Sequence, residues 1–313
     1  MFDMGGPAGG DLLDQLRAGG LARPRVDPDQ IAAVRSRLEH AARAHTAGLD
    51  PGTVVRVSKQ DVTTILACEG HAAAERRAKR PPTQAQVLGI LMDAVFRHLV
   101  TTGSAEDPLR VAREALEVDA ERNADIVAYL DGLAPGPGSE LARGVEAMTR
   151  ALTRRWPSLP ARFHPRTQER SVVSLAGGAV VLSGVLDLAI GVPDGMSARV
   201  CLVDVKAGKP RVEHRADMHF YALIETLRSG APPFQVASYY LTDGRLDREA
   251  VTAVVLESAT RRCCDAIERL CRLADGKEPS LTPNPLCPWC AARPGCAPGR
   301  QWIDRKEAHD GDA

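Results

Sequence analysis

The chain has 313 residues, enough for one large domain or two small ones with a sizeable core. Its 40 acidic and 40 basic side chains cancel, so it is not a polycation, and any affinity for nucleic acid must come from local basic patches. Because no apolar run reaches membrane-spanning length and the N-terminus lacks secretory features, we expect a cytoplasmic protein without membrane contact. Eight cysteines in that compartment favour metal ligation or core packing over disulfides.

The N-terminal third is expected to be helical. Residues 1–27 are glycine-rich and predict a flexible N-terminus with one short helix near 11–17. Periodicity predicts a helix over 28–48, and residues 54–57 are typical of a short strand. Ser58 is a good N-cap, so one helix is expected from there to about residue 79, with Cys68 in its middle. A lone helical cysteine is usually a packing residue.

The next segment also predicts helices, and it ends in the most basic stretch of the chain, residues 143–170. A helix over 83–100 contains Asp93, and two or three more are expected between 108 and 156, interrupted by a Gly/Pro loop at 132–138. Residues 143–170 interleave arginines with aromatic residues, which suits phosphate contact and base stacking. For each arginine the alternative is a solvated helix face. The arginines singled out as nucleic-acid contacts are Arg154, Arg155, Arg76 and Arg77.

Residues 184–209 predict two apolar strands joined by a tight connection. Asp187, Asp204 and Lys206 are embedded in them. Antiparallel pairing centred near residue 195 would place Asp187 within one position of Asp204, and the strand period of two puts Asp204 and Lys206 on one face. Two such carboxylates repel unless a cation lies between them, and oxygen ligands favour Mg²⁺ or Mn²⁺. A surface hairpin with solvated charges is the alternative, which the apolar flanks disfavour.

The remaining elements complete a mixed sheet. Residues 212–229 predict a helix that carries Asp217 and Tyr221 one turn apart. Two further strands are expected over 234–241 and 250–256, followed by a last helix over 259–274. The cysteines expected to pack in the core are Cys201, Cys263, Cys264 and Cys271.

Three cysteines, Cys287, Cys290 and Cys296, lie in a Pro/Gly-rich stretch without periodicity, so packing does not explain them. Either a zinc knuckle or an iron–sulfur cluster completed by a distant cysteine fits their spacing. No cysteine follows them, and the nearest histidine, His309, lies in a charged tail, which favours a remote fourth ligand. Beyond residue 303 we expect disorder.

The pattern Gly184-x-x-Asp187, then Asp204-x-Lys206-x-Gly-Lys, resembles the nuclease core of the PD-(D/E)xK superfamily, and its RecB-like branch in particular. The resemblance implies a restriction-endonuclease-like α/β fold, a mixed β-sheet flanked by helices. Asp187 and Asp204 would hold the metal, and Lys206 would act on the attacking water. Residues 28–302 would form one nuclease domain: a mainly helical part (28–165), a catalytic core (166–280) and a cysteine motif (281–302), with a disordered tail over 303–313.

The C-terminal Cys-Pro-Trp-Cys and Arg-Pro-Gly-Cys segments resemble the signature of iron–sulfur RecB-like nucleases, similar to the CRISPR-adaptation and AddB-type exonucleases. By that resemblance a 4Fe–4S cluster would be held by Cys68, Cys287, Cys290 and Cys296, stapling the N-terminal region to the C-terminus.

At two positions the chain departs from these relatives. Many of them have a histidine at the position of Asp93, and Asp93 would substitute for it as an oxygen ligand. They have a glutamine at the position of Asp217. Tyr221 matches the relatives' tyrosine, which contacts the active site and the phosphate backbone. Glu169 is a candidate outer member of the metal site.

The resemblance implies a Mg²⁺- or Mn²⁺-dependent DNA nuclease of exonuclease type, acting in repair, recombination or defence. Its partner would be DNA, single-stranded or with ends, and a helicase or other repair and defence proteins are candidate partners. The alternative is a non-catalytic nucleic-acid-binding or assembly subunit that keeps the scaffold, which the two departures favour.

Overall fold

The computed structural model describes residues 9–17, 23, 25, 27–78, 80–118, 120–121, 123–132, 139–194 and 197–311. Its centre is a six-stranded sheet in the order β1-β3-β4-β5-β6, with β2 paired to the other edge of β3. The β1–β3 and β4–β5 pairs are parallel and the rest antiparallel, so the expected mixed sheet is confirmed. The strands are β1 (Val55–Val57), β2 (Arg166–Leu175), β3 (Val180–Ile190), β4 (Cys201–Lys206), β5 (Gln235–Tyr240) and β6 (Leu246–Ala250).

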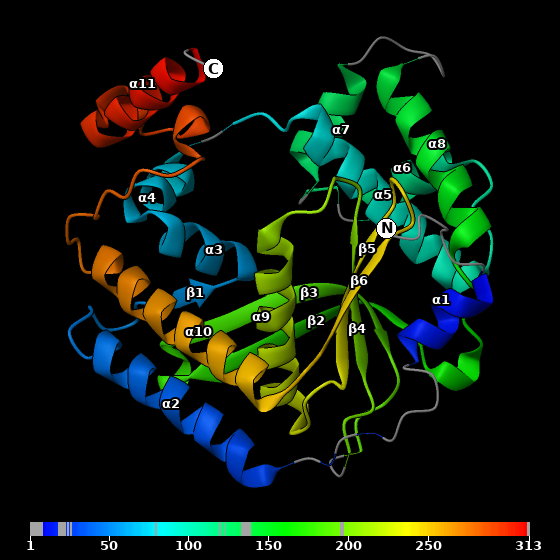
Figure 1. The fold of residues 1–313 in the computed structure, drawn as a ribbon, viewed down its shortest axis with the longest axis horizontal. Coiled ribbons are helices and arrows are strands. Elements are labelled where there is room, and N and C mark those ends of the chain that lie inside the picture. Colours follow the sequence, from blue (N-terminus) through cyan, green and yellow to red (C-terminus); the bar gives the residue numbers. More distant parts are fainter. Residues whose placement is uncertain are drawn as a thin grey trace.

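Helices cover both faces of the sheet, as Figure 1 shows. One side carries α1 (Gly9–Leu16), α5 (Gln84–Thr102), α6 (Pro108–Glu117), α7 (Ala124–Asp131) and α8 (Glu140–Arg155). The other side carries α2 (Pro28–Thr46), α3 (Lys59–Ala67), α9 (Val212–Ser229) and α10 (Ala253–Ala274). The helices α4 (Glu69–Arg77) and α11 (Ala297–Gly311) lie near the C-terminal cysteines.

Burial alternates along the strands and produces a core on each face. Leu188 and Val203 pack with α5 and α8, whereas Leu202 and Val236 pack with α9 and α10. This alternation follows from the strand period of two, and it explains why β3, β4 and β5 are apolar on both faces. As expected, Cys201, Cys263 and Cys271 are buried in these cores, while Cys264 is half-buried.

One edge of β3 changes partners along its length. Residues 180–182 pair with β1, and residues 188–190 pair with β4. In the part of the chain that the structure describes, no strand pairs with residues 183–187 on that edge, which leaves a notch between β1 and β4. The strand β4 brings Asp204 and Lys206 to this notch, and α3, which begins two residues after β1, brings Lys59.

The predicted single helix over 58–79 is wrong, because the chain breaks at Cys68. Ser58 and Asp61 form a reciprocal capping box that starts α3, as expected of an N-cap. Cys68 then adopts an extended conformation (φ −167°, ψ 122°) between α3 and α4. This break lets its thiol accept a hydrogen bond from the Thr282 amide (3.4 Å), far along the chain.

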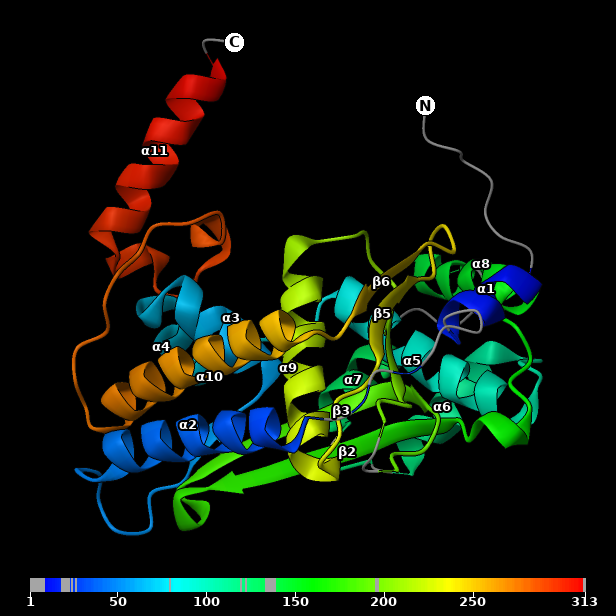
Figure 2. The same cartoon turned by 60° about the horizontal axis from the view of Figure 1, so that its bottom comes forward.

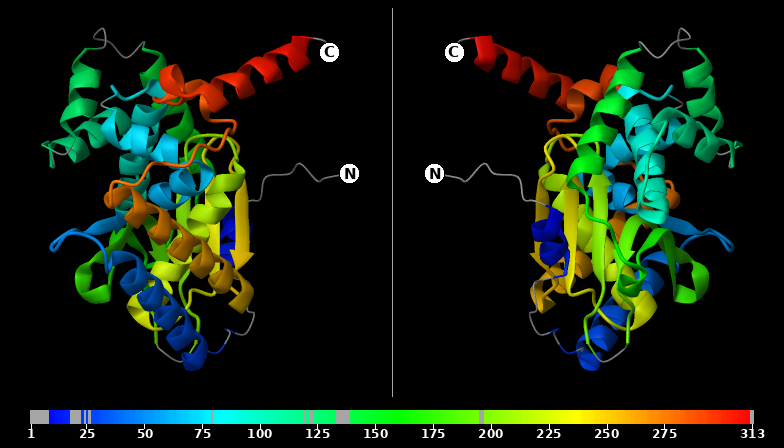
Figure 3. Two further views of the ribbon diagram at one scale, coloured as in Figure 1. Left: turned by 90° about the vertical axis from the view of Figure 1, so that its left-hand side faces the viewer. Right: turned by 90° about the vertical axis from the view of Figure 1, so that its right-hand side faces the viewer.

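Two predictions near the C-terminus are also wrong. The strand expected over 250–256 lies earlier, at β6, because the Thr252 hydroxyl caps the next helix by accepting from the Val255 amide, and α10 begins at Ala253. The tail expected to be disordered forms α11 as far as Gly311, a helix that projects away from the rest of the molecule in Figures 2 and 3. None of the described helices is both long and apolar enough to cross a membrane.

Several expectations lie wholly or partly outside the described residues. These concern the flexibility of residues 1–8, 18–22, 24 and 26, the loop over 133–138, the middle of the β3–β4 connection at 195–196, and the end of the tail at 312–313. The predicted short helix near 11–17 corresponds to α1. The proposed domain boundaries stay a prediction.

Candidate active site

Asp187 lies in the notch, and its side chain accepts a hydrogen bond from β4 where the backbone pairing of β3 with β4 has ended. The β3–β4 register pairs Leu188 with Val203, so continuing it would set Asp187 opposite Asp204, one position from residue 203, where the sequence predicted it. Instead of a backbone pair, the Asp187 carboxylate accepts a hydrogen bond from the Val205 amide at 2.6 Å. This bond holds β3 and β4 at a fixed separation and orients the carboxylate toward Asp204.

Asp204 is buried between two lysines. Its Oδ1 accepts a hydrogen bond from Lys59 Nζ at 3.0 Å, and its Oδ2 lies 2.5 Å from Lys206 Nζ without hydrogen-bond geometry. Only 2% of the Asp204 side chain is exposed. Although burial works to raise its pKa, the two ammonium groups lower it, so Asp204 is held ionised.

Lys59 was not predicted from the sequence. It is the first residue of α3 and lies 145 positions from Asp204, with no local pattern that marks it. Its ammonium also lies 4.9 Å from the centroid of the Tyr221 ring. Burial opposes its charge, but Asp204 raises its pKa, so the lysine stays protonated.

Asp93 approaches the same site from α5. Its Oδ1 accepts a hydrogen bond from Gln168 Nε2 at 2.8 Å. Gln168 lies on β2, at the register position that faces Asp187, and has a left-handed backbone conformation (φ +54°) that is rare for a residue other than glycine. We attribute this conformation to the need to turn the amide toward Asp93, a role that the sequence did not reveal.

The α9 helix supplies Asp217 and Tyr221. Asp217 Oδ2 lies 3.8 Å from Lys206 Nζ, so this carboxylate also reaches the site. Tyr221 is buried, and its hydroxyl donates to the Val185 carbonyl at 2.5 Å. A Cβ at Gly184 would lie 2.8 Å from the Tyr221 ring, so glycine is needed there for the ring to fit against β3.

The electrostatics of the cluster favour a cation. Four carboxyls, Asp93, Asp187, Asp204 and Asp217, face two ammonium groups, with the Arg97 guanidinium near Asp93. Burial first, and then the charges of Asp204 and Asp93, raise the pKa of Asp187 well above its usual range. Burial also raises the pKa of Asp93 and of Asp217. A divalent cation would offset the repulsion between these carboxylates and favour their ionised forms.

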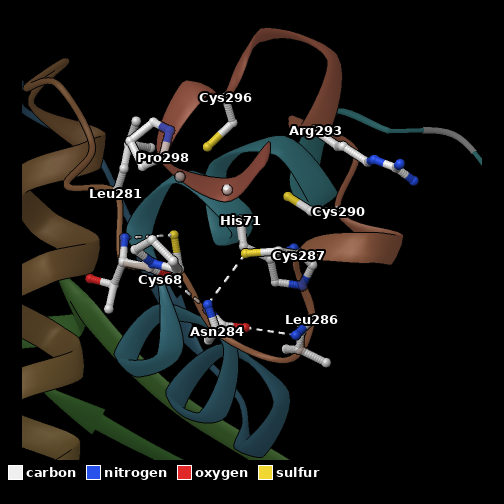
Figure 4. Close-up of a pocket in the computed structure, with 14 residues that line it drawn as sticks. Cys68, His71, Leu281, Asn284, Leu286, Cys287, Cys290, Arg293, Cys296 and Pro298 are labelled. Atoms are coloured by element: carbon white, nitrogen blue, oxygen red, sulfur yellow. Dashed lines mark hydrogen bonds between the residues drawn. The ribbon is translucent and has the colours of Figure 1, made fainter. Parts of the chain in front are cut away.

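The four cysteines predicted to act together lie around one pocket. Cys68 comes from the α3–α4 break, and the others come from two short helical turns that precede α11. Figure 4 shows the four sulfur atoms pointing toward a common space. The Asn284 amide donates to Cys287 Sγ at 3.3 Å, and a Cβ at Gly299 would lie 3.1 Å from Cys296 Sγ. Within the described residues, no three His, Cys, Asp or Glu side chains are arranged so that they could hold a metal ion.

The predicted nucleic-acid contacts lie on separate elements. Arg154 and Arg155 end α8, and Arg155 packs against the β5–β6 turn at Gly244. Arg76 and Arg77 end α4, where Arg76 pairs with Asp61 at 2.7 Å. Their role in binding stays a prediction.

Glu169 is the candidate outer member of the metal site, and that role stays a prediction. It forms ion pairs of 3.0 Å with both Arg166 and Arg228, which neutralise it.

Comparison with known proteins gives the family. The family model of the PD-(D/E)XK nuclease superfamily matches residues 56–297, most of the chain. The chain belongs to the PD-(D/E)XK nuclease superfamily. The match spans every carboxylate of the notch and all four clustered cysteines, and it supports a hydrolytic nuclease. No curated protein matches the chain.

Two of the solved structures that match this nuclease-superfamily chain have low sequence identity to it. One, described as "Putative exonuclease" from Eubacterium rectale, is 15% identical, with a TM-score of 0.46, over 72% of this chain and 83% of that one. A second, named SSO0001, is 10% identical, with a TM-score of 0.31, over 86% of this chain and 97% of that one.

Proposed function

We propose that the protein is a metal-dependent DNA nuclease of exonuclease type that hydrolyses phosphodiester bonds in repair, recombination or defence. The observation that carries the proposal is the convergence of Asp187 and Asp204 in the notch of β3, with Lys206 against Asp204. Acid, acid and lysine on adjacent strands are the residue types that the superfamily motif requires.

The donor types suit a hard divalent ion, although the described carboxylates are not gathered as a three-ligand group in this structure. Asp187 and Asp204 would hold Mg²⁺ or Mn²⁺, with Asp93 as a third oxygen ligand, since carboxylate oxygens suit these ions. When bound, such an ion supplies Lewis-acid stabilisation of charge on the phosphate and lowers the pKa of a bound water.

Three other side chains of the site, Lys206, Lys59 and Tyr221, have separate roles. Only 17% of the Lys206 side chain is exposed, and its ammonium group lies against Asp204. Lys206 would orient the attacking water or neutralise the charge that develops on the phosphate. Lys59 holds Asp204 from the opposite oxygen. Tyr221 supports Lys59 with its ring and anchors α9 to β3 with its hydroxyl.

The decisive experiment compares Asp204→Asn with wild type on labelled single- and double-stranded DNA with Mn²⁺. The substitution removes charge at nearly constant shape, so cleavage should be lost. Asp265→Asn, on the exposed surface of α10, is the matched control and should cleave normally. Undiminished cleavage by Asp204→Asn would remove the assigned site. DNA binding without any cleavage by wild-type protein would instead favour the non-catalytic subunit, whose specific support is Asp93 and Asp217 at positions that relatives fill with histidine and glutamine.

We also infer that the cysteine pocket holds a structural 4Fe–4S cluster. The support is the convergence of Cys68 with Cys287, Cys290 and Cys296 from distant segments, together with backbone amides that donate to two of the thiols. Fe–S clusters are held by four cysteine thiolates, and hydrogen bonds to their sulfurs are a usual feature of such sites. The cluster would tie the α3–α4 break to the C-terminal segment.

Anaerobic purification tests this inference. Wild-type protein should be brown and contain about four irons per chain, since the proposed cluster has four. Both Cys68→Ser and Cys287→Ser should lose the colour, whereas Cys264→Ser, outside the pocket, should keep it. Colourless protein that contains zinc, or a Cys68→Ser variant that retains its iron, would contradict the cluster.

A further inference from the structure

A groove lined by basic residues lies at the end of β3, apart from the carboxylate cluster. An open groove of ≈ 1160 Å³ runs between α1, the turn at 161–163 and the start of the β3–β4 connection. Among the described residues, five arginines and one acidic residue, Asp194, line it. Asp194 is itself engaged by Arg199 at 2.7 Å. The arginines of this groove, called here the basic groove, are Arg17, Arg23, Arg25, Arg162 and Arg199.

Three of these guanidinium groups are held over aromatic rings. Arg17 and Arg162 lie 4.6 and 4.9 Å from the centroid of the Phe163 ring, and Arg23 lies 3.6 Å from that of Phe234. Cation–π contact fixes the planes of these side chains without consuming their hydrogen-bond donors on a carboxylate. Arg23 donates to the Arg17 carbonyl at 2.6 Å, and the remaining donors of these three side chains are available to an anion from outside.

The positive charge of the groove is concentrated rather than dispersed. Burial lowers the pKa of Arg23, and the like charges of Arg17 and Arg199 lower it further. Such mutual repulsion is relieved when a polyanion binds.

The groove wall is rigid. Gly191, at the end of β3, has φ +100°, and a Cβ there would lie 2.4 Å from the Arg199 carbonyl, so only glycine fits. The Gly191 amide donates to the Phe163 carbonyl at 2.8 Å, and the Arg166 guanidinium donates to the Gly191 carbonyl. These bonds hold the Phe163 turn against the strand and fix the spacing of its arginines.

We propose that the basic groove binds a segment of a nucleic-acid strand through its phosphates, with bases stacked on the guanidinium planes. Arginine forks match phosphate geometry, and guanidinium planes are a recognised stacking surface for unpaired bases. The inference rests on the proposed nuclease function for the identity of its ligand. Gly191 lies four residues beyond Asp187 on one strand, about 13 Å at ~3.3 Å per residue, so one bound strand is long enough to reach both sites.

Binding is best measured with cleavage switched off. A fluorescent 20-nucleotide single strand is titrated against the Asp204→Asn protein over a range of salt concentrations. Arg17→Glu combined with Arg162→Glu should weaken binding at least 10-fold and reduce the slope of log K against log salt by about 1.4, since each lost contact with a single strand removes ~0.7. Arg113→Glu with Arg261→Glu, both exposed and outside the groove, changes net charge equally and should leave the slope unchanged.

Competitors identify the ligand. Unlabelled 20-nucleotide strand should displace the probe far better than inorganic triphosphate. Displacement by triphosphate at equal concentration would mean a site for free phosphate and overturn the strand proposal, as would an equal loss of binding in the control variant. Failure of the proposed function is separately visible, because cleavage by Asp204→Asn in Mn²⁺ would refute the active site, whereas the binding titration is run without divalent ions and keeps the probe intact.

Discussion

Replacing Lys59 with methionine tests whether this lysine stands in the active site as a counter-charge. Methionine keeps most of the length and apolar stem of lysine and removes only the ammonium group. That group lies 3.0 Å from Asp204 Oδ1, and 27% of the Lys59 side chain is exposed, so the pair is only partly screened by water.

The magnitude follows from the environment of Asp204. A hydrogen bond to a charged group contributes about 1.5–3 kcal/mol, and loss of one partner of a fully buried ion pair costs 3–5 kcal/mol. Because Lys206 still pairs with Asp204, the lower range applies, and Lys59→Met should lower the free energy of unfolding by ~2 kcal/mol without divalent ions. The same change removes the ammonium group that competes with a metal ion for Asp204, so Mg²⁺ and Mn²⁺ should bind more tightly. Each 1.4 kcal/mol of lost Lys59–Asp204 interaction would raise their affinity about tenfold.

Urea unfolding with and without Mn²⁺ measures both effects. A double-mutant cycle with Asp204→Asn isolates the pair, because residues in contact show coupling that distant residues lack. The Lys59→Met penalty should shrink greatly in the Asp204→Asn background, and Mn²⁺ should restore more stability to Lys59→Met than it adds to wild type. An equal penalty in both backgrounds would show that Lys59 stabilises the fold without acting on Asp204.

Two further predictions concern groups that support the site. Gly184→Ala should destabilise the protein by about 1–3 kcal/mol in urea unfolding, because the new Cβ would lie 2.8 Å from the buried Tyr221 ring; an unchanged midpoint would mean that the ring moves freely. Gln168→Ala should weaken Mn²⁺ binding at least 10-fold by calorimetry, since residues that orient a ligand typically have that effect; wild-type affinity would show that Asp93 needs no support from Gln168.

The strands that carry the motif could be predicted because their signal is local. Apolar runs with an embedded acid fix the strand period, and the tight connection fixes the register, so Asp187 and Asp204 were expected within one position of facing each other, as the β3–β4 register has them. The α9 helix was likewise predicted with its observed ends, because its apolar period runs unbroken to a glycine, Gly230, with φ +71°.

Features that depend on distant parts of the chain could not be predicted. Local propensity favours one helix through Cys68, but contacts of its thiol and of Gly70 with the segment near residue 281 coincide with the break. In the sequence, Lys59 has the pattern of a solvated lysine in the first turn of a helix. Only the pairing of β1 in the sheet places it beside Asp204. The left-handed Gln168 carries no sequence signal, since strain of this kind persists only where the surrounding structure imposes it.

The helix α3 links the two sites that the sequence treats separately. Its first residue is Lys59, on Asp204, and the residue after its last is Cys68, in the cysteine pocket. Nine residues at 1.5 Å each make a rigid element of about 13 Å, too short to bend appreciably. A cluster that fixes Cys68 would therefore also fix the position of the Lys59 ammonium relative to Asp204. Loss of iron in Cys68→Ser should then change Mn²⁺ affinity in the same direction as Lys59→Met, whereas a cluster that only holds the termini together would leave that affinity unchanged.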